Sequence, residues 1–145
     1  MDYSLHILIM ALFGHVAGDY FCQTKAMALN KSLNKDCSNW RQALLWSVYH
    51  SITYAIFVCI FIRSFDFTIM LLVFLSHWPV DVFSLADKWL GFIKGRTFKQ
   101  AMEDQSEFRG FNVAFTAIVY TVVDNTMHLF LLYLIIIWGL GEGLL

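Results

Sequence analysis

Seven ionisable side chains lie inside long apolar stretches of this chain, where charged groups are costly. They are His15, Asp19, His50, His77, Asp81, Asp124 and His128. Six of them form three His/Asp pairs in which the two residues are four positions apart. In a helix this spacing places both side chains on one face, about one turn apart. A carboxylate and an imidazole so placed can bind one ion together.

The energetic cost of burying these groups points to a bound cation. An aspartate near the centre of a membrane helix costs roughly 2.5 to 3.5 kcal/mol, so three cost about 8 to 10 kcal/mol, comparable with the stability of a whole domain. A divalent ion can offset this cost, since structural zinc sites supply about 10 to 16 kcal/mol. The seven side chains offer more ligands than one tetrahedral ion uses, which favours two ions bridged by carboxylate.

The donor set narrows the choice of metal. Imidazole with carboxylate and no thiolate suits zinc best, with manganese or iron as alternatives, and argues against copper(I) and iron–sulfur clusters. One His/Asp pair by itself is more typical of an interhelical hydrogen bond or a proton relay. Three pairs and a fourth histidine in a chain of 145 residues favour metal. His6, nine residues before His15, falls on the opposite face of its helix and is placed outside the site.

Two further polar residues extend the same helix faces and are predicted to bind substrate. Gln23, four residues after Asp19, can donate hydrogen bonds beside the metal or can be a simple interfacial side chain. Lys88, seven residues after Asp81, returns to that helix face at the end of the span. It can bind a phosphate or an anionic headgroup, or extend to the membrane surface without a function.

Two more residues adjoin the predicted ligands. Pro79, the only proline, lies between His77 and Asp81 and is expected to kink that helix and free a carbonyl group. Tyr54, one turn after His50, can orient that imidazole or supply a proton, although most tyrosines in membrane helices serve in packing.

The elements that must position these side chains are membrane helices. The composition, 59% hydrophobic and 17% aromatic, exceeds what a soluble core requires. A hydrocarbon core of about 30 Å takes roughly 20 helical residues. Four segments are long enough, and without alternating polarity they favour helices over strands. We therefore expect an all-α, four-transmembrane-helix bundle forming a single domain, with spans at about 4–22, 43–63, 67–89 and 111–138.

Net charge and the cysteine pattern argue against a nucleic-acid-binding protein and against a CxxC motif, and the N-terminal segment argues against a removable signal peptide. A formal net charge of −1 gives no electrostatic case for nucleic-acid binding. The N-terminal apolar run has no basic residues before it and no small-residue cleavage site after it, so it is expected to be a retained span. The cysteines form no CxxC motif and are expected to be reduced or incidental. They are Cys22, Cys37 and Cys59.

The distribution of basic residues predicts orientation. Eight of the ten Lys and Arg residues lie between spans one and two or between spans three and four, Lys88 lies at the adjoining end of span three, and only Arg63 lies at the other face. Short cytoplasmic loops are enriched in these residues, so both termini are predicted on the non-cytoplasmic side. The segment "WLGFIKGRTFKQAMEDQSEFRG" suits either a helix lying on anionic lipid or a solvated charged loop.

Several motifs together carry a resemblance to a known family. "GHVAGDYFCQT" followed by "ALNKS", the span-two "YHS", "LSHWPVDV" and "VVDNTMHLF" resemble the bacterial and phage membrane proteins grouped as domain of unknown function 3307. That family has an H-x-x-G-D-[FY]-x-x-Q opening, a span-two histidine, an S-H-x-x-x-D helix and a closing D-Q-x-x-H. This chain has Asn125 where the family usually has glutamine. The likeness covers nearly all 145 residues and implies a multi-pass protein of the bacterial inner membrane.

The family name assigns no reaction, but the arrangement is also similar to membrane-bound metal-dependent hydrolases. The expected function is hydrolysis of a phosphoester or lipid-linked substrate near the cytoplasmic face, with the seven residues as metal ligands and one of them free to act as a general base. A proton or divalent-cation carrier, or a channel subunit, is the first alternative, and oligomerisation would give it the room it needs. A non-catalytic partner protein whose bundle is stabilised by metal is the second alternative.

Overall fold

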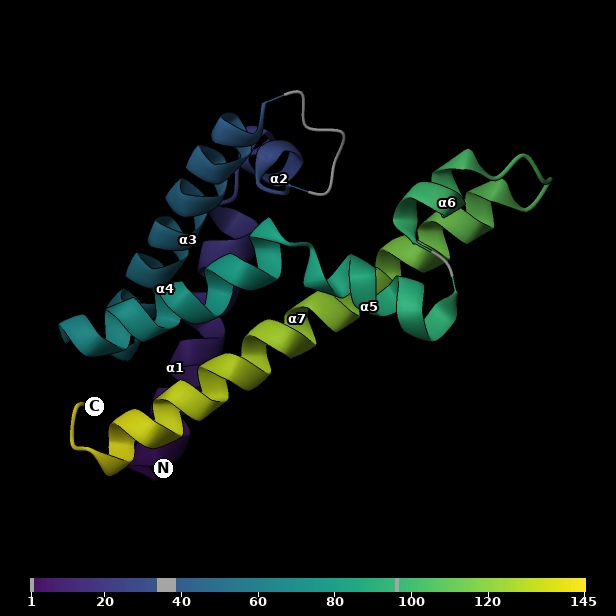
Figure 1. The fold of residues 1–145 in the computed structure, drawn as a ribbon. Helices are drawn as coiled ribbons and strands as arrows, with labels where there is room; N and C mark the ends of the chain where they lie inside the picture. The colour runs from purple at the N-terminus through teal and green to yellow at the C-terminus, as the bar shows by residue number, and fades with distance from the viewer. Residues whose placement is uncertain (1, 34–38, 96) are drawn as a thin grey trace.

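The computed structural model describes residues 2–33, 39–95 and 97–145, and the regular elements in these ranges are all helical (Figure 1). In chain order they are α1 (Tyr3–Val16), the π-helical turn η1 (Ala17–Phe21), α2 (Lys25–Asn30), α3 (Trp40–Ile62), α4 (Phe67–Val82), α5 (Leu85–Lys94), α6 (Phe98–Glu103) and α7 (Arg109–Gly141).

Three helical stretches are long and apolar enough to cross a membrane. They are α1 together with η1, then α3, and then α7. The pair α4 and α5 passes the same test jointly but is bent by 52°, so there are three candidate spans among the described residues, or four if the bent pair counts as one. The all-helical prediction is confirmed, and the predicted segments coincide with these helices. Insertion into a membrane and the sides on which the termini lie remain predictions.

The third predicted span bends later than its proline. Pro79 lies inside α4, which continues to Val82, and the helix breaks at Phe83 and Ser84. Ser84 adopts a left-handed backbone conformation with φ of 47°, which is uncommon for a residue with a side chain. The helix thus continues through Pro79, and the bend of 52° lies four to five residues further along, where the backbone of Ser84 turns the chain into α5.

Glycines bring α1 and η1 into close contact with α3. A Cβ atom added at Gly14 would lie 2.8 Å from the Cα of Val58, and one added at Gly18 would lie 3.0 Å from the Cα of Tyr54. Small residues four positions apart allow two helix backbones to approach each other this closely in membrane proteins. The two glycines thereby place their neighbours, His15 and Asp19, directly beside α3.

The helices α1, α3, α4 and α7 form a bundle in which α4 packs between α3 and α7, and α1 packs on both α3 and α7. One half of this bundle is an apolar core, and both chain termini lie at that end (Figure 1). The core residues that adjoin the polar half are Ala11, Val58, Val73 and Leu132. The polar half of the bundle thus lies next to an apolar core.

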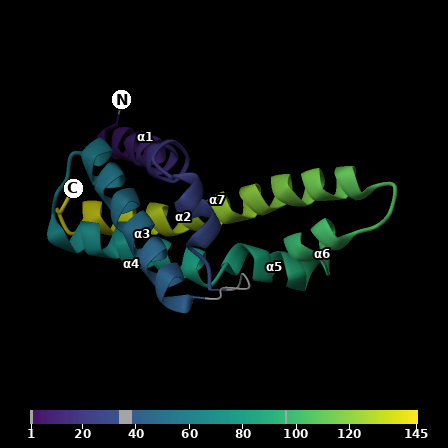
Figure 2. The same cartoon turned by 90° about the horizontal axis from the view of Figure 1, so that it is seen from above.

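The segment after the break forms an arm beside the first half of α7. Both views show α5 and α6 running along α7 and extending away from the bundle (Figures 1 and 2). Ala86 and Leu90 are buried in this arm, whereas Trp89 and Phe92 are exposed. The segment predicted as one surface helix or a charged loop is two short helices, and its contact with lipid remains a prediction.

Candidate metal centre

Six of the seven predicted side chains converge at the polar end of the bundle. Asp19 comes from η1, His50 from α3, His77 and Asp81 from α4, and Asp124 and His128 from α7. Five of them are buried, and Asp124 is half-buried at the edge. Residues separated by up to about a hundred positions in the sequence therefore meet at one point, as the helix-face patterns predicted.

Asp81 is the centre of this cluster. Its Oδ2 atom lies 3.1 Å from His77 Nε2 and 3.2 Å from His50 Nε2, and its Oδ1 atom lies 3.7 Å from His128 Nε2. His50 Nε2 lies 3.3 Å from Asp19 Oδ1. A tetrahedral ion with bonds of about 2.0 to 2.2 Å separates its donor atoms by roughly 3.3 to 3.6 Å. The spacing of these atoms is therefore close to that of a ligand shell.

Three sets of donor atoms in the described chain are compact enough to hold an ion, each with its atoms within 4.8 Å of one another. They are Asp19, His50 and His77; His77, Asp81 and His128; and Asp19, Asp124 and His128. An imidazole nitrogen has one lone pair and binds one ion, whereas a carboxylate can bridge two. Two ions can be held together only by the first and third sets, which share Asp19.

Several buried nitrogens in the cluster have no hydrogen-bond partner in the described part of the chain. They are Nδ1 of His50, Nδ1 of His77 and both ring nitrogens of His128. Buried polar atoms nearly always have a partner, so each such atom requires an explanation. The His128 imidazole thus makes no hydrogen bond within the described residues. Its Nε2 atom lies 3.7 Å from an oxygen of Asp81 and 3.7 Å from an oxygen of Asp124. This geometry suits an ion or water between them.

Aromatic stacking fixes the ring planes. Tyr54 stacks on His77 with ring centroids 3.7 Å apart, and His77 stacks on His128 at 4.0 Å. The Tyr54 hydroxyl is 3.1 Å from Nδ1 of His15. The sequence suggested that Tyr54 orients His50; in the structure it orients His77 and His15 instead, because α1 and α4 both face it.

His15 is the one predicted ligand that lies outside the donor sets. Its Nδ1 pairs with Tyr54 and its Nε2 lies 2.7 Å from Oδ1 of Asn125, so both ring nitrogens already have partners. Asn125 also donates to the Tyr20 hydroxyl and to the carbonyl of Thr121. The prediction placed His15 and Asp19 on one ion, but both ring nitrogens of His15 are engaged by Tyr54 and Asn125, whereas Asp19, inside η1, belongs to two of the donor sets.

Gln23 and Lys31 complete the polar cluster. Gln23 Nε2 lies 3.1 Å from His50 Nε2 and 3.4 Å from Asp19 Oδ1, so the predicted adjacency is present. The Nζ atom of Lys31 lies 2.8 Å from Asp81 Oδ2, 3.3 Å from His50 Nε2 and 3.9 Å from Asp19 Oδ1. Sequence reasoning used Lys31 only to orient the protein, because the residue follows the short helix α2 and no periodicity relates it to the spans.

Lys88 and His6 lie apart from the cluster. Lys88 is exposed on α5, with its Nζ atom 5.8 Å from the centroid of the Phe83 ring. The helix break at Ser84 removes α5 from the register of α4, so counting seven residues from Asp81 no longer returns Lys88 to the same face. His6 is exposed on α1, away from the donor sets, as predicted.

Neither of the two cysteines in the described part of the chain belongs to a donor set. Cys22 and Cys59 are free thiols, and Cys59 is buried in α3. Cys37 lies outside the described residues.

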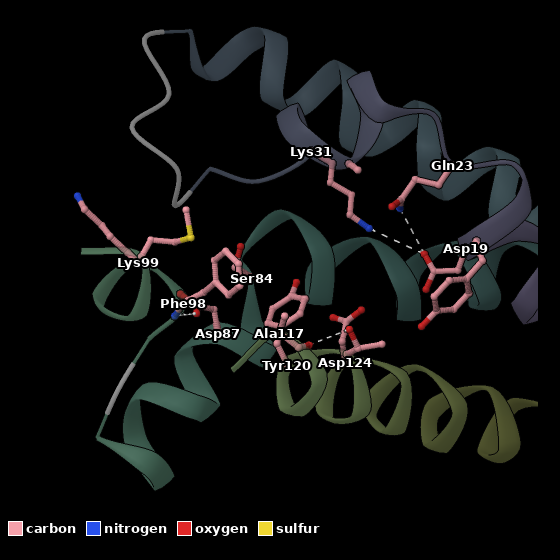
Figure 3. A pocket seen from close by; sticks show the side chains of 14 residues that line it. Asp19, Gln23, Lys31, Ser84, Asp87, Phe98, Lys99, Ala117, Tyr120 and Asp124 are labelled. Atoms are coloured by element: carbon pink, nitrogen blue, oxygen red, sulfur yellow. Dashed lines mark hydrogen bonds and ion pairs between the residues drawn. The ribbon is translucent and has the colours of Figure 1, made fainter. Parts of the chain in front are cut away.

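A cavity of about 710 Å³ opens directly onto the cluster. Figure 3 shows Asp19, Lys31 and Asp124 at one end, with Tyr120 further along. Phe98 and Lys99, from α6, line the other end. This size is within the range of roughly 300 to 1,000 Å³ for small-molecule sites. The cavity connects the charged cluster with an apolar region between α6 and α7.

Comparison with curated proteins gives no match, and comparison with solved structures gives none. A family model described as "Protein of unknown function (DUF3307)" matches residues 7–142, which includes every side chain of the cluster. The chain therefore belongs to the DUF3307 family.

Proposed function

We propose that this protein is a membrane-embedded, metal-dependent hydrolase that acts on a phosphoester or related lipid-linked substrate near the cytoplasmic face. The observation that carries the proposal is the continuity between the buried donor cluster and the 710 Å³ cavity, which has Asp19, Lys31 and Asp124 at one end and, at the other, Phe98 and Met102 of α6 beside the charged Lys99 and Asp87. An amphiphilic substrate fits this division, with its anionic group at the cluster and its apolar part along α6 and α7.

The charge of the cluster supports a cation. Asp19, Asp81 and Asp124 carry three negative charges when ionised, and Lys31 is the cation in contact with two of them. With neutral imidazoles the cluster has a net charge of −2. Buried uncompensated charge is strongly destabilising, and one divalent ion balances it. A second ion would give a net charge of +2, which an anionic substrate would have to balance.

One resident ion, with zinc preferred and manganese or iron as alternatives, is best assigned to Asp19, His50 and His77. The distances within this set include 3.3 Å from His50 to Asp19 and 3.1 Å from His50 to His77. Asp19 also lines the cavity, so an ion there would be reached by a substrate. The number of ligands favours two ions, but the charge balance favours one resident ion. Asp19 is the carboxylate that could bridge to a second ion.

When bound, such an ion lowers the pKa of a coordinated water and polarises a phosphoryl oxygen. Residues of the chain would then transfer the proton of the attacking water. Asp124 lines the cavity, and its carboxylate is 14% exposed and stands outside the assigned set. It is placed to accept a proton from an attacking water at Oδ2 and to share it with His128 Nε2, 3.7 Å away.

The apolar core beside the cluster supports an enzyme over an ion carrier. Val73 and Leu132, one turn from His77 and His128 toward the termini, belong to the buried apolar core. A second, smaller cavity on that side, of about 190 Å³, is lined by residues such as Leu8, Leu129 and Ile136. In the described part of the chain, the cluster thus has a polar approach on one side and an apolar layer on the other.

The proposal is tested by metal analysis and turnover of the protein purified in detergent without chelator. We expect about one zinc, manganese or iron ion per chain. We also expect metal-dependent release of phosphate from phosphatidic acid or a polyprenyl phosphate in mixed micelles. Asp19→Asn should lose both the ion and the activity, while His6→Ala keeps both. Absence of bound metal would overturn the proposal, and metal without turnover of either substrate would reduce the cluster to a structural site.

A further inference from the structure

We propose that Lys31 occupies the cation position of the cluster until metal binds, and then moves into the cavity to bind the anionic group of the substrate. Metal and anion would therefore bind cooperatively, through this one side chain. The inference rests on the proposed function, since it requires a metal site at the cluster.

The Lys31 ammonium contacts atoms that the metal needs. It lies 3.3 Å from His50 Nε2 and 2.8 Å from Asp81 Oδ2. The first atom belongs to the donor set Asp19, His50 and His77, and Asp81 belongs to the set with His77 and His128. Lys31 thus contacts one residue in each of the two donor sets that contain His77: His50 in the first and Asp81 in the second.

The two cations cannot both bind His50 Nε2, although both charges can remain beside the three carboxylates of the cluster. His50 Nε2 has one lone pair, so it either accepts a hydrogen bond from the ammonium or binds a metal ion. An ion bound at about 2.0 to 2.1 Å from that nitrogen would also lie within roughly 6 Å of the ammonium, a distance at which like charges repel strongly in a buried site. Metal binding therefore requires Lys31 to leave His50 and Asp81 for the adjoining cavity, which Asp19 and Asp124 also line, and this movement releases Asp81 Oδ2 as a further donor.

The cavity is the place to which Lys31 can move. Lys31 lines it together with Asp19 and Asp124 (Figure 3). The side chain is 13% exposed, and it reaches the cluster from the end of α2 on a flexible alkyl stem. An ammonium released into the cavity beside a bound ion presents a second positive charge to a ligand, and ammonium groups bind phosphate through charge-assisted hydrogen bonds. The expected ligand class is therefore a phosphate or phosphoester.

The experiment measures zinc affinity by chelator competition, with and without inorganic phosphate, for the full chain and two variants. Lys31→Met keeps the length of the side chain and removes its charge, and Lys88→Met is the matched control on an exposed lysine. We expect Lys31→Met to bind zinc about tenfold more tightly than the unaltered protein when phosphate is absent, a coupling of ordinary size. We expect phosphate to tighten zinc binding about tenfold in the unaltered protein and in Lys88→Met, and less than about twofold in Lys31→Met.

A second measurement uses the unaltered protein and does not depend on how a variant folds. Zinc loading should increase the acylation rate of Lys31 by a small amine reagent, as measured by mass spectrometry, and phosphate should reverse that increase. The rate at Lys88 should not change. Equal or weaker zinc binding by folded Lys31→Met, the same phosphate effect in both proteins, or unchanged acylation of Lys31 would each overturn the inference.

The two proposals fail in different ways. If neither the unaltered protein nor Lys31→Met binds zinc, the proposed metal site is wrong and the inference falls with it. If zinc and phosphate bind cooperatively through Lys31 but no phosphoester is hydrolysed, the inference stands and the proposed reaction is wrong.

Discussion

Gly14→Ala is expected to push α1 away from α3 and disturb the cluster. The added Cβ would lie 2.8 Å from Val58 Cα and 3.3 Å from both the Phe57 carbonyl oxygen and Phe61 Cβ. Ordinary contact begins at 3.4 Å, so the helices must separate by about 0.6 Å or more; the nearest atom is backbone, and no rotamer change can relieve the contact. Overpacking of this kind costs roughly 1 to 3 kcal/mol.

Gly110→Ala is the matched control, because a Cβ at Gly110 in α7 meets nothing within 4 Å. Gly110 is the second residue of α7, where helix propensity counts for less than the roughly 1 kcal/mol of an interior position, so the difference between the variants slightly understates the clash. At roughly 2 to 4 °C per kcal/mol for a chain of this size, Gly14→Ala should melt about 2 to 12 °C below Gly110→Ala.

The assay is thermal unfolding in detergent, combined with metal content. Separation of α1 and η1 from α3 also moves Asp19 Oδ1 away from His50 Nε2, now 3.3 Å apart, so Gly14→Ala should retain less metal than Gly110→Ala. If the two variants melt at the same temperature, the close approach of these helices is wrong, and so is the explanation of how Gly14 positions the neighbouring site residues.

Three other predictions concern the cluster and the topology. Removing metal with a permeant chelator should lower the melting temperature by roughly 10 °C or more, because the cluster then keeps an uncompensated charge; an unchanged melt would leave hydrogen bonds as the explanation for the buried acids. Asp124→Asn should keep the ion and lose turnover, whereas Asp81→Asn should weaken metal binding; loss of metal from Asp124→Asn as complete as from Asp19→Asn would refute the assigned set. A cysteine placed after Glu142 should react with an impermeant reagent in intact cells while one between α6 and α7 is protected, and the reverse pattern would refute the orientation.

The sequence by itself determined the helices and most of the cluster. Long apolar runs predict spans because backbone groups in lipid must be paired within the segment, and the structure has helices at each predicted position. The i,i+4 spacing also held where the helix is regular: His77 and Asp81 meet in α4 at 3.1 Å. His50, alone in its span, was assigned only because three other helices offered partners, and it does lie among them.

Only the tertiary structure decided which polar residues join the cluster and which do not. The break at Ser84 turns Lys88 away from the position that residue counting predicts, and hydrogen bonds with Tyr54 and Asn125, which come from two other helices, occupy both ring nitrogens of His15. Periodicity is a rule for regular helices and fails at such a break. Lys31 follows a short helix outside the spans and reaches Asp81, 50 positions away, through packing alone. No pattern along the chain encodes that contact, because it depends on how α2 packs against the bundle.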